Sequence, residues 1–330
     1  MAQVQVVYFN VADTLEYEKS LLQKWGIDNL DLIEAKDCGQ SFAERAGGAD
    51  GAVVEYEQVT DDVMGRLANC KIIALQSIGY NNIDIAAATK HQICVTNAPG
   101  FCTEEVALHS VGLIIDLVRN ISYHDRAMRA GNWSYEAAPK TTRLSGKTAG
   151  LVYFGSIPKA MTPMLKAMGL RVLVYAPTKS AEYLARFGAE KSETLEELLQ
   201  TADFVSLHMP LHETTRHMIG EEQLKMMKKS AFLINTARGA VVDEPALVRA
   251  LRDGTIAGAG IDVFEDEANQ KTELTRFENV VITPHTAFLS EDSFYGAREI
   301  ALRQIVDCLV LKRAPQNLVN KELANIFQAE

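Results

Sequence analysis

Short runs of β-branched and other apolar residues alternate along the chain with longer stretches in which apolar residues recur every three or four positions. The short runs are typical of buried strands, and the longer stretches are typical of helices that cover a sheet. This alternation predicts an α/β protein with doubly wound, parallel, Rossmann-like sheets. The predicted strands are 4–9, 51–54, 71–75 and 93–96 in a first series and 150–154, 171–175, 204–207, 231–235, 257–262 and 280–283 in a second.

Two series of strands predict two sheets and therefore two domains. Helical patterns cover 195–199, 221–226 and 244–252, and a longer helix is expected from Thr103, a plausible N-cap, to about Ile121. The turn sequence Asn97-Ala98-Pro99-Gly100 precedes this helix and indicates a domain boundary. Because its apolar residues cover more than one stripe, we expect two surfaces to bury it, one of them in a second subunit.

Composition and charge narrow the classes of partner and compartment. The net charge is −10 and the Lys and Arg residues are scattered, which disfavours nucleic acid and anionic membranes as partners. The amino terminus lacks the pattern of a signal peptide, and His109, Ser110 and Asp116 interrupt the longest apolar stretch. Five cysteines without a C-x-x-C spacing indicate reduced thiols rather than a disulfide framework, so the expected location is cytoplasmic.

Three segments far apart in the chain carry side chains suited to reducing a 2-oxo acid: Arg238, Glu267 and His285. A guanidinium can clamp a carboxylate, and an imidazolium backed by a carboxylate can donate a proton to a carbonyl oxygen. Each segment runs from apolar residues into a polar turn, as at the strand ends of an open parallel sheet. In the competing interpretation, Arg238 is a surface arginine paired with Asp243 or Glu244. Glu267 is then one more acid in the run 265–267.

The turn after the strand at 150–154 carries a damaged dinucleotide fingerprint. Of G-x-G-x-x-G, the sequence Tyr153-Phe154-Gly155-Ser156-Ile157-Pro158 keeps only the middle glycine, so a plain strand-turn-helix is the competing interpretation. At the end of the next strand, Ala176 stands where NAD-binding proteins usually carry Asp or Glu. Thr178 and Lys179 could contact a 2′-phosphate, which favours NADP slightly over NAD, although Lys179 could equally be an ordinary surface charge.

In order and spacing, seven segments resemble the D-isomer-specific 2-hydroxyacid dehydrogenases: QSIGYNNID, NAPGFCTEEVALHS, LSGKTAGLVYFGSIPKAM, SLHMPLHETTRHMI, LINTARGAVVDEPAL, AGIDVFEDE and ITPHTAF. The resemblance implies a substrate domain formed by residues 1–100 plus 290–330 and a dinucleotide-binding domain formed by residues 101–289. It also implies a homodimer whose active site lies in an interdomain cleft.

The family's functional residues fall on definite positions of this chain. The resemblance implies that Arg238 binds the substrate carboxylate, that His285 is the proton donor and that Glu267 stabilises its protonated form. It places the substrate loop at Ser77, Ile78 and Gly79, with Phe288 beside the substrate. The implied cofactor contacts are Gly155, Ser156, Ile157, Ala176, Thr178, Lys179, Met209, Pro210, Thr215, Thr236, Ala237, Arg238 and Asp262, the last for the carboxamide.

We therefore expect an oxidoreductase that transfers hydride between NAD(P)H and a small 2-oxo acid to give a D-2-hydroxy acid. The alternative is a dinucleotide-sensing protein of the same fold with weak catalysis, suggested by Tyr153, Pro158 and Ala176. No metal site is expected, because His208, His212 and His217 cross from a strand end into a loop without a supporting cysteine.

Overall fold

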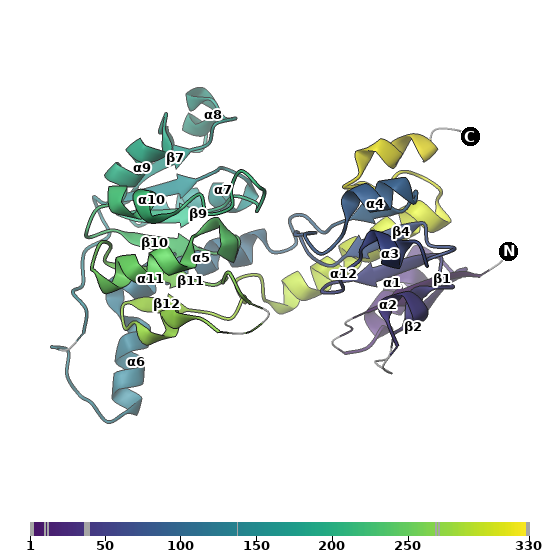
Figure 1. Ribbon diagram of the computed structural model, residues 1–330, viewed down its shortest axis with the longest axis horizontal. Coiled ribbons are helices and arrows are strands. Elements are labelled where there is room, and N and C mark those ends of the chain that lie inside the picture. Colours follow the sequence, from purple (N-terminus) through teal and green to yellow (C-terminus); the bar gives the residue numbers. More distant parts are fainter. Residues whose placement is uncertain are drawn as a thin grey trace. The chain divides into compact units, whose positions relative to one another are not determined.

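The structure is a computed structural model and describes residues 3–9, 11, 13–35, 40–136, 138–267, 269 and 271–327. The chain forms two compact units, one made of Met1–Phe101 with Ser290–Glu330 and the other of Cys102–Leu289 (Figure 1). We call them unit 1 and unit 2. Each contains one parallel sheet with helices on both faces, which confirms the predicted fold class.

Unit 1 has a five-stranded sheet in the order β2-β1-β3-β4-β5. Helices α2 to α4 cover one face of the sheet, and α1 and α12 cover the other. The elements are β1 (Val4–Tyr8), α1 (Glu16–Trp25), β2 (Leu30–Glu34), α2 (Phe42–Ala46), β3 (Gly51–Val54), α3 (Asp61–Met64), β4 (Ile72–Leu75), α4 (Ile85–Lys90), β5 (Cys94–Thr96), α12 (Glu291–Ile305), the π-helical η3 (Val306–Val310) and the 3₁₀-helical η4 (Lys321–Phe327).

Unit 2 has a seven-stranded sheet in the order β12-β11-β10-β9-β6-β7-β8. The order reverses between β6 and β9, which is where doubly wound sheets bind ligands at the carboxyl ends of their strands. The elements are α5 (Thr103–Arg119), α6 (Ile121–Arg129), β6 (Thr148–Val152), α7 (Ser156–Ala167), β7 (Arg171–Tyr175), α8 (Ala181–Ala185), β8 (Glu190–Lys191), α9 (Leu195–Thr201), β9 (Phe204–Leu207), α10 (Glu221–Met226), β10 (Phe232–Asn235), η1 (Gly239–Val241), α11 (Glu244–Arg252), β11 (Gly258–Ile261), η2 (Glu273–Arg276) and β12 (Val280–Ile282).

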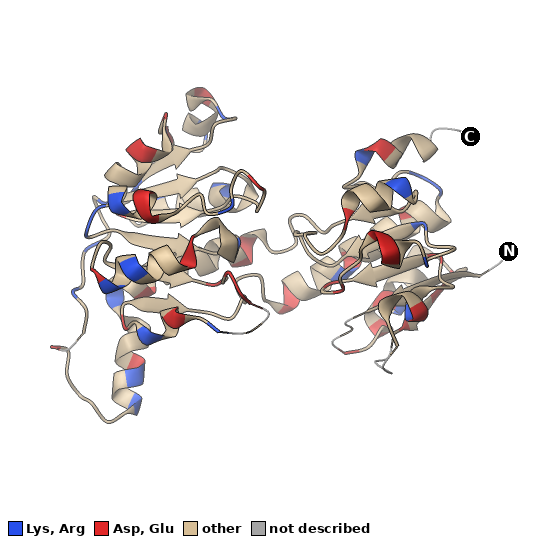
Figure 2. Ribbon diagram, viewed as in Figure 1, with Lys and Arg blue, Asp and Glu red and all other residues tan. Residues whose placement is uncertain are grey.

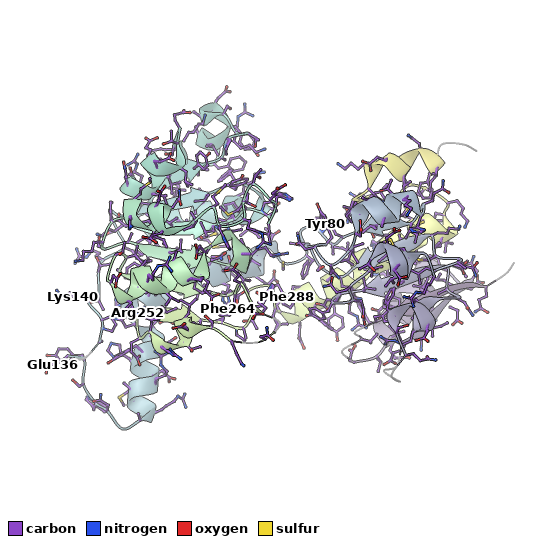
Figure 3. All side chains as sticks on the ribbon, viewed as in Figure 1. Tyr80, Glu136, Lys140, Arg252, Phe264 and Phe288 are labelled. Carbon is purple, nitrogen blue, oxygen red and sulfur yellow. The ribbon has the colours of Figure 1, made fainter. Side chains whose placement is uncertain are left out.

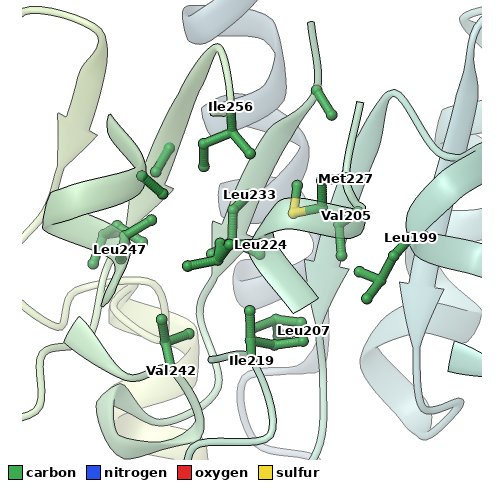
Figure 4. Close-up of a cluster of buried hydrophobic side chains, with 14 of the residues drawn as sticks. Leu199, Val205, Leu207, Ile219, Leu224, Met227, Leu233, Val242, Leu247 and Ile256 are labelled. Carbon is green, nitrogen blue, oxygen red and sulfur yellow. The ribbon is translucent and has the colours of Figure 1, made fainter. Parts of the chain in front are cut away.

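Apolar packing on both faces fixes the strand ends of unit 2. Every residue of β9, β10 and β11 is buried, as expected of central parallel strands. On one face, Val205, Leu233 and Leu224 belong to a cluster that α9, α10 and α11 close (Figure 4). On the other face, α5 and α7 pack against the same sheet. Each large buried side chain stabilises the fold by about 1.5–3 kcal/mol, so the loops after these strands start from a rigid base.

The sequence pattern misses two of the strands that lie at sheet edges, β2 and β8. Strand β2 contains Asp31 and Glu34 and is only partly buried, and β8 has two residues, so neither presents an uninterrupted apolar run. One boundary prediction is also wrong by a residue: Cys102 is the N-cap of α5, and Thr103 is its first helical residue. Strand β6 begins at Thr148 and ends at Val152, two residues before the predicted end, because Tyr153 already turns away with a positive φ.

Acidic and basic side chains are interspersed over both units (Figure 2). Among the described residues, no helix combines the length and the apolar character needed to span a bilayer. Cys70, Cys94, Cys102 and Cys308 are free and buried, and Cys38 lies outside the described residues.

Candidate active site

The structure brings Arg238, Glu267 and His285 to the carboxyl ends of three neighbouring strands of unit 2. Arg238 follows β10, Glu267 lies in the loop after β11, and His285 follows β12. Phe264 and Phe288, which belong to the same two loops as Glu267 and His285, lie on the side of unit 2 opposite Glu136 and Lys140 (Figure 3). Residues separated by 47 positions in the sequence therefore converge because parallel strands end at one edge of the sheet.

His285 and Glu267 form a hydrogen-bonded pair. The distance from His285 Nδ1 to Glu267 Oε2 is 2.9 Å, and the Phe264 amide donates to Glu267 Oε1 at 3.1 Å. Burial alone would raise the pKa of Glu267, but the bond and charge of His285, the Phe264 amide and the charge of Arg238 hold this pKa below its usual value. An ionised Glu267 accepts from Nδ1–H, which leaves Nε2 as the ring atom free to exchange a proton with a substrate.

The backbone around Arg238 is held by Asn235 at the end of β10. Asn235 Nδ2 donates to the Arg238 carbonyl at 2.9 Å, and Asn235 Oδ1 accepts from the Ala237 amide at 3.0 Å. Burial lowers the pKa of the Arg238 guanidinium and Glu267 opposes the shift, so the group remains a cation. Its Nη1 donates to the Ala237 carbonyl at 2.6 Å. A partly buried cation whose side chain makes one hydrogen bond within the described part of the chain suits a carboxylate ligand.

Gly239 brings the turn that carries Arg238, called the arginine turn, against the loop that carries Glu267. A Cβ at Gly239 would lie 1.8 Å from the carbonyl oxygen of Phe264 and 2.5 Å from the amide nitrogen of Glu265. No side chain fits at such distances, so glycine is required for this backbone contact. The contact fixes the position of the Glu267 loop relative to Arg238.

His285 has a left-handed backbone, with a φ of 54°. This conformation costs a non-glycine residue about 1–2 kcal/mol, so its surroundings must hold it. The His285 amide donates to the Asp262 carbonyl at 2.8 Å, and the Asp262 carboxylate accepts from the amides of Thr286 and Ala287 at 2.9 and 3.0 Å. Asp262 therefore anchors the histidine turn from both sides.

The turn after β6 leaves room for a ligand. A Cβ at Gly155 would meet no protein atom within 4 Å, and Ser156 and Ile157 open α7 with amides that have no intrahelical partner. An anion is stabilised at such a helix start, so this turn fits the pyrophosphate of a dinucleotide. Pro158 is the third helical residue, where its missing N–H costs no hydrogen bond. Tyr153 is half-buried against the cluster under α9 to α11.

Two lysines lie near the Tyr183 ring beyond the end of β7. Lys159 Nζ lies 5.5 Å from the centre of the Tyr183 ring, and Lys179 Nζ lies 5.3 Å from the same centre. A hydrogen bond from Lys159, together with the charges of Lys159, Lys179 and Arg186, lowers the pKa of Tyr183. Ala176, at the same strand end, is buried and carries no charge. The end of β7 is therefore electropositive at the place where NAD-binding proteins usually carry an Asp or Glu that binds the ribose.

Comparisons with known proteins agree with this geometry. The family model for the NAD-binding domain of D-isomer-specific 2-hydroxyacid dehydrogenases matches residues 111–287, more than half of the chain. The chain belongs to this family. The glyoxylate reductase of Thermococcus litoralis is 40% identical over 81% of this chain and 82% of its own. The D-lactate dehydrogenase of Aquifex aeolicus, complexed with NAD and lactic acid, superimposes with a TM-score of 0.83 at 30% identity, covering 96% of this chain and 99% of its own.

Membership confirms the predicted family and reaction class. The protein is an NAD(P)-dependent oxidoreductase that interconverts 2-oxo acids and D-2-hydroxy acids. The match to the family's NAD-binding domain falls entirely within unit 2. The individual site residues expected from the sequence remain predictions, and the structure adds what each of them contacts.

The substrate loop predicted for this dehydrogenase follows β4 in unit 1. Ser77 Oγ donates to the Gly79 carbonyl at 2.7 Å, Asn97 Nδ2 donates to the Ile78 carbonyl at 2.8 Å, and the Ala98 amide donates to the Ser77 carbonyl at 2.9 Å. The carbonyls of the loop are thus occupied within unit 1. Its amides are the groups that suit an anionic ligand.

Several predicted cofactor residues shape loops with their side chains. Met209 is in the core, and the buried Thr215 hydroxyl donates to the Pro210 carbonyl at 2.7 Å and accepts from the His212 amide at 2.8 Å. Thr236 Oγ1 lies 2.8 Å from Ser110 Oγ of α5. For Met209 and Thr215, a contact with a cofactor would have to use the backbone.

The three histidines considered as metal ligands lie in different surroundings. Burial lowers the pKa of His208 to about 3, while His217 Nε2 lies 2.6 Å from Glu265 Oε1 and His212 is exposed. No group of three potential metal-ligating side chains occurs among the residues that the structure describes.

Sequence inspection missed several residues that the structure brings to the site. Lys159 lies 20 positions before Lys179 and joins it only through the fold, although a lysine in the first turn after Gly155 is a usable signal. Gly239 was not singled out, because its contact with Phe264 spans 25 positions. His109 interrupts an apolar stretch, and a histidine in an apolar helix calls for a polar partner, which is the signal that the sequence carries.

Proposed function

We propose that this dehydrogenase reduces small 2-oxo acids, with glyoxylate as the first candidate, and that Arg238, Glu267 and His285 perform the reaction. The His285–Glu267 pair beside a partly buried Arg238 is the observation that carries the proposal. Support for the substrate comes from the relatives named glyoxylate reductase. The Phe288 ring lies 6.3 Å from the His285 ring in an edge-to-face arrangement and is suited to limit the size of the substrate.

Each residue has a separate task in the proposed reaction. Arg238 binds the substrate carboxylate through its planar donor fork and polarises the 2-oxo group. A nicotinamide bound at this site would supply the hydride for C2 of the substrate. His285 Nε2–H donates its proton to the carbonyl oxygen, and the ionised Glu267 compensates the charge on the imidazolium before that transfer. One hydride and one proton convert the ketone or aldehyde to an alcohol, and the reverse direction starts with neutral His285.

A direct assay of cofactor oxidation tests this proposal. Purified protein is mixed with NADPH or NADH and with glyoxylate, hydroxypyruvate, pyruvate or phenylpyruvate, and cofactor oxidation is followed. We expect turnover of the smaller acids, with the D-isomer formed wherever the product is chiral. His285→Gln should lower kcat about 10³-fold, since a general acid contributes about 10²–10⁴-fold. The control is His91→Gln, because His91 pairs with Asp61 on the surface of unit 1. Dinucleotide binding without turnover of any of these acids would favour the sensor alternative and contradict the proposal.

We infer further that the preferred cofactor is NADPH. Lys159 and Lys179 flank Tyr183 at the end of β7, and the buried Ala176 supplies no carboxylate to repel a 2′-phosphate. Both ammonium groups would attract a phosphate of charge near −2 bound in this turn. Thr178, exposed in the same turn, offers a hydroxyl to the same ligand.

Titration with both cofactors tests the preference. We expect Lys159→Ala with Lys179→Ala to raise the Kd for NADPH about 10- to 100-fold, and to change the Kd for NADH less than twofold. Lys225→Ala serves as the charge-matched control, since Lys225 pairs with Glu221 on α10. Equal losses for both cofactors would contradict a 2′-phosphate site.

We propose that the active form is a cytoplasmic homodimer. Trp133 and Tyr135 are 87% and 82% exposed, and they follow α6, which itself exposes Ile121 and Met128. Such a group of large apolar side chains is typical of a surface that a partner covers. The free, buried thiols support a reducing compartment. Sedimentation velocity of the wild type and of Trp133→Ser with Tyr135→Ser should show a dimer that the double variant dissociates; a monomeric wild type would refute it.

A further inference from the structure

A chain of hydrogen bonds joins the middle of α5 to the histidine turn. His109 Nε2 lies 2.9 Å from Thr283 Oγ1, and Thr283 Oγ1 donates to Asp262 Oδ1 at 2.5 Å. His109 Nε2 is also 3.7 Å from that same carboxylate oxygen. All three residues belong to unit 2, and Asp262 is 1% exposed.

The chemistry of the groups fixes the direction of these bonds. An ionised carboxylate only accepts, so the Thr283 hydroxyl proton points to Asp262. The Thr283 oxygen must then accept from His109, which places a proton on Nε2 of the His109 ring. The same carboxylate accepts from the Thr286 and Ala287 amides. The chain therefore ends on the two amides that directly follow His285.

The turn that these bonds support is a strained one. His285 has a φ of 54°, and its amide donates both to the Asp262 carbonyl at 2.8 Å and to the Thr283 carbonyl at 3.1 Å. A buried carboxylate keeps its orientation only while its donors remain. Loss of the Thr283 hydroxyl bond would free Asp262 Oδ1 to rotate away from the Thr286 amide, and the left-handed turn would lose one of its supports.

Helix α5 is itself fixed against the strand ends. A Cβ at Gly260 of β11 would lie 3.0 Å from Leu113 Cβ, so the helix packs closely on the sheet at this point. Ser110, the neighbour of His109, meets Thr236 at 2.8 Å near the arginine turn. The position of His109 is therefore fixed, because it lies one helical turn from the contact between Leu113 and Gly260.

We propose that His109 and Thr283 are positioning residues for the proton donor: through Asp262 they hold the left-handed turn that aims His285 at Glu267 and at the substrate. The inference rests on the proposed role of His285 and adds the residues that make its geometry. Neither His109 nor Thr283 takes part in proton transfer to the substrate. Their removal should therefore slow the chemical step more than it weakens dinucleotide binding.

Kinetics of matched variants provide the first test. His109→Leu and Thr283→Val should each lower kcat about 10-fold, because a small misplacement of a catalytic group has effects of this order, and the change in the Kd for NADPH should be smaller than the change in kcat. His109→Gln and Thr283→Ser, which keep a donor or hydroxyl at the same place, should recover most of the rate. His91→Leu is the control for loss of a histidine. An unchanged kcat in His109→Leu and Thr283→Val would overturn the inference.

A double-mutant cycle and amide exchange separate this inference from the proposed function. In a His285→Gln background, His109→Leu should lower the residual rate no further, since its effect acts through His285. The same 10-fold loss in that background would overturn the inference. Hydrogen exchange at Thr286 and Ala287 should be at least 10-fold faster in His109→Leu, and unchanged exchange would also overturn it. Full activity of His285→Gln would refute the proposed acid, while the exchange rates still decide whether His109 holds the turn.

Discussion

The two ends of the unit 2 sheet hold their functional groups in different ways. After β10, β11 and β12, the groups proposed for proton transfer are fixed by hydrogen bonds at 2.9 to 3.1 Å and by a backbone contact at Gly239. After β6 and β7, the dinucleotide end has open space at Gly155 and two lysines that meet one ring. Proton transfer needs atoms placed within a fraction of an ångström, whereas binding by amides and charges tolerates substitutions. This explains how Tyr153, Pro158 and Ala176 can coexist with the residues proposed for acid–base chemistry.

The largest expected effect is that of Arg238→Lys. A lysine keeps the charge but loses the planar fork, so the substrate carboxylate and the 2-oxo group cannot be held together. We expect kcat/KM for glyoxylate to fall about 10³-fold, with NADPH affinity within threefold of the wild type. Arg249→Lys is the control, because Arg249 makes an exposed pair with Glu221. A loss below 10-fold would mean that charge alone suffices at this end and would weaken the contrast between the two ends.

A pair of glycine variants compares the two ends directly. Gly239→Ala would force the Phe264 backbone to move, so we expect a loss of about 10²-fold in kcat and a lower free energy of unfolding. Gly155→Ala meets no protein atom within 4 Å, so its stability should equal that of the wild type while dinucleotide affinity falls. Urea denaturation and fluorescence titration measure the two quantities. The contrast would be wrong if Gly155→Ala destabilised the fold or left the affinity unchanged.

Sequence reasoning reached the acid–base end more completely than the dinucleotide end. Arg238, Glu267 and His285 follow strands with clear apolar runs, so their meeting at one edge follows from parallel topology. The contact between Gly239 and Phe264 and the left-handed turns at Tyr153 and His285 depend on distances and dihedral angles that no residue pattern encodes. The position of Lys159 and Lys179 near the same Tyr183 ring depends on how α7 lies beside β7. Strand β8 was missed because two residues at a sheet edge carry no periodic signal.

Replacing Tyr153 separates backbone strain from bulk at the dinucleotide end. Tyr153 has a φ of 70° and its amide donates to the Tyr175 carbonyl at 2.7 Å. Tyr153→Gly removes a left-handed strain of about 1–2 kcal/mol but also the packing of the ring, so the net change in unfolding free energy should stay within about 1 kcal/mol. Tyr153→Ala keeps the strain and loses the ring, and should be less stable than Tyr153→Gly. NADPH affinity should rise a few-fold in both, and a fall in both would show that the ring contacts the cofactor.

An effect on stability alone concerns pH and His208, which follows β9 between the two ends of the sheet. Burial lowers the pKa of His208 to about 3, from the value of 6.5 expected in the unfolded chain. Between these values the unfolded chain binds a proton that the folded protein does not, so stability falls as the pH falls below 6.5, by at most about 1.4 kcal/mol per pH unit. The depressed pKa of Glu267 withdraws its own contribution only below pH 4.5. Urea denaturation at pH 7.5 and pH 5 should therefore show a loss in the wild type that is up to about 2 kcal/mol larger than in His208→Gln. Equal losses in both proteins would show that His208 takes up its proton in the folded state, and that the strand between the two ends is open to water.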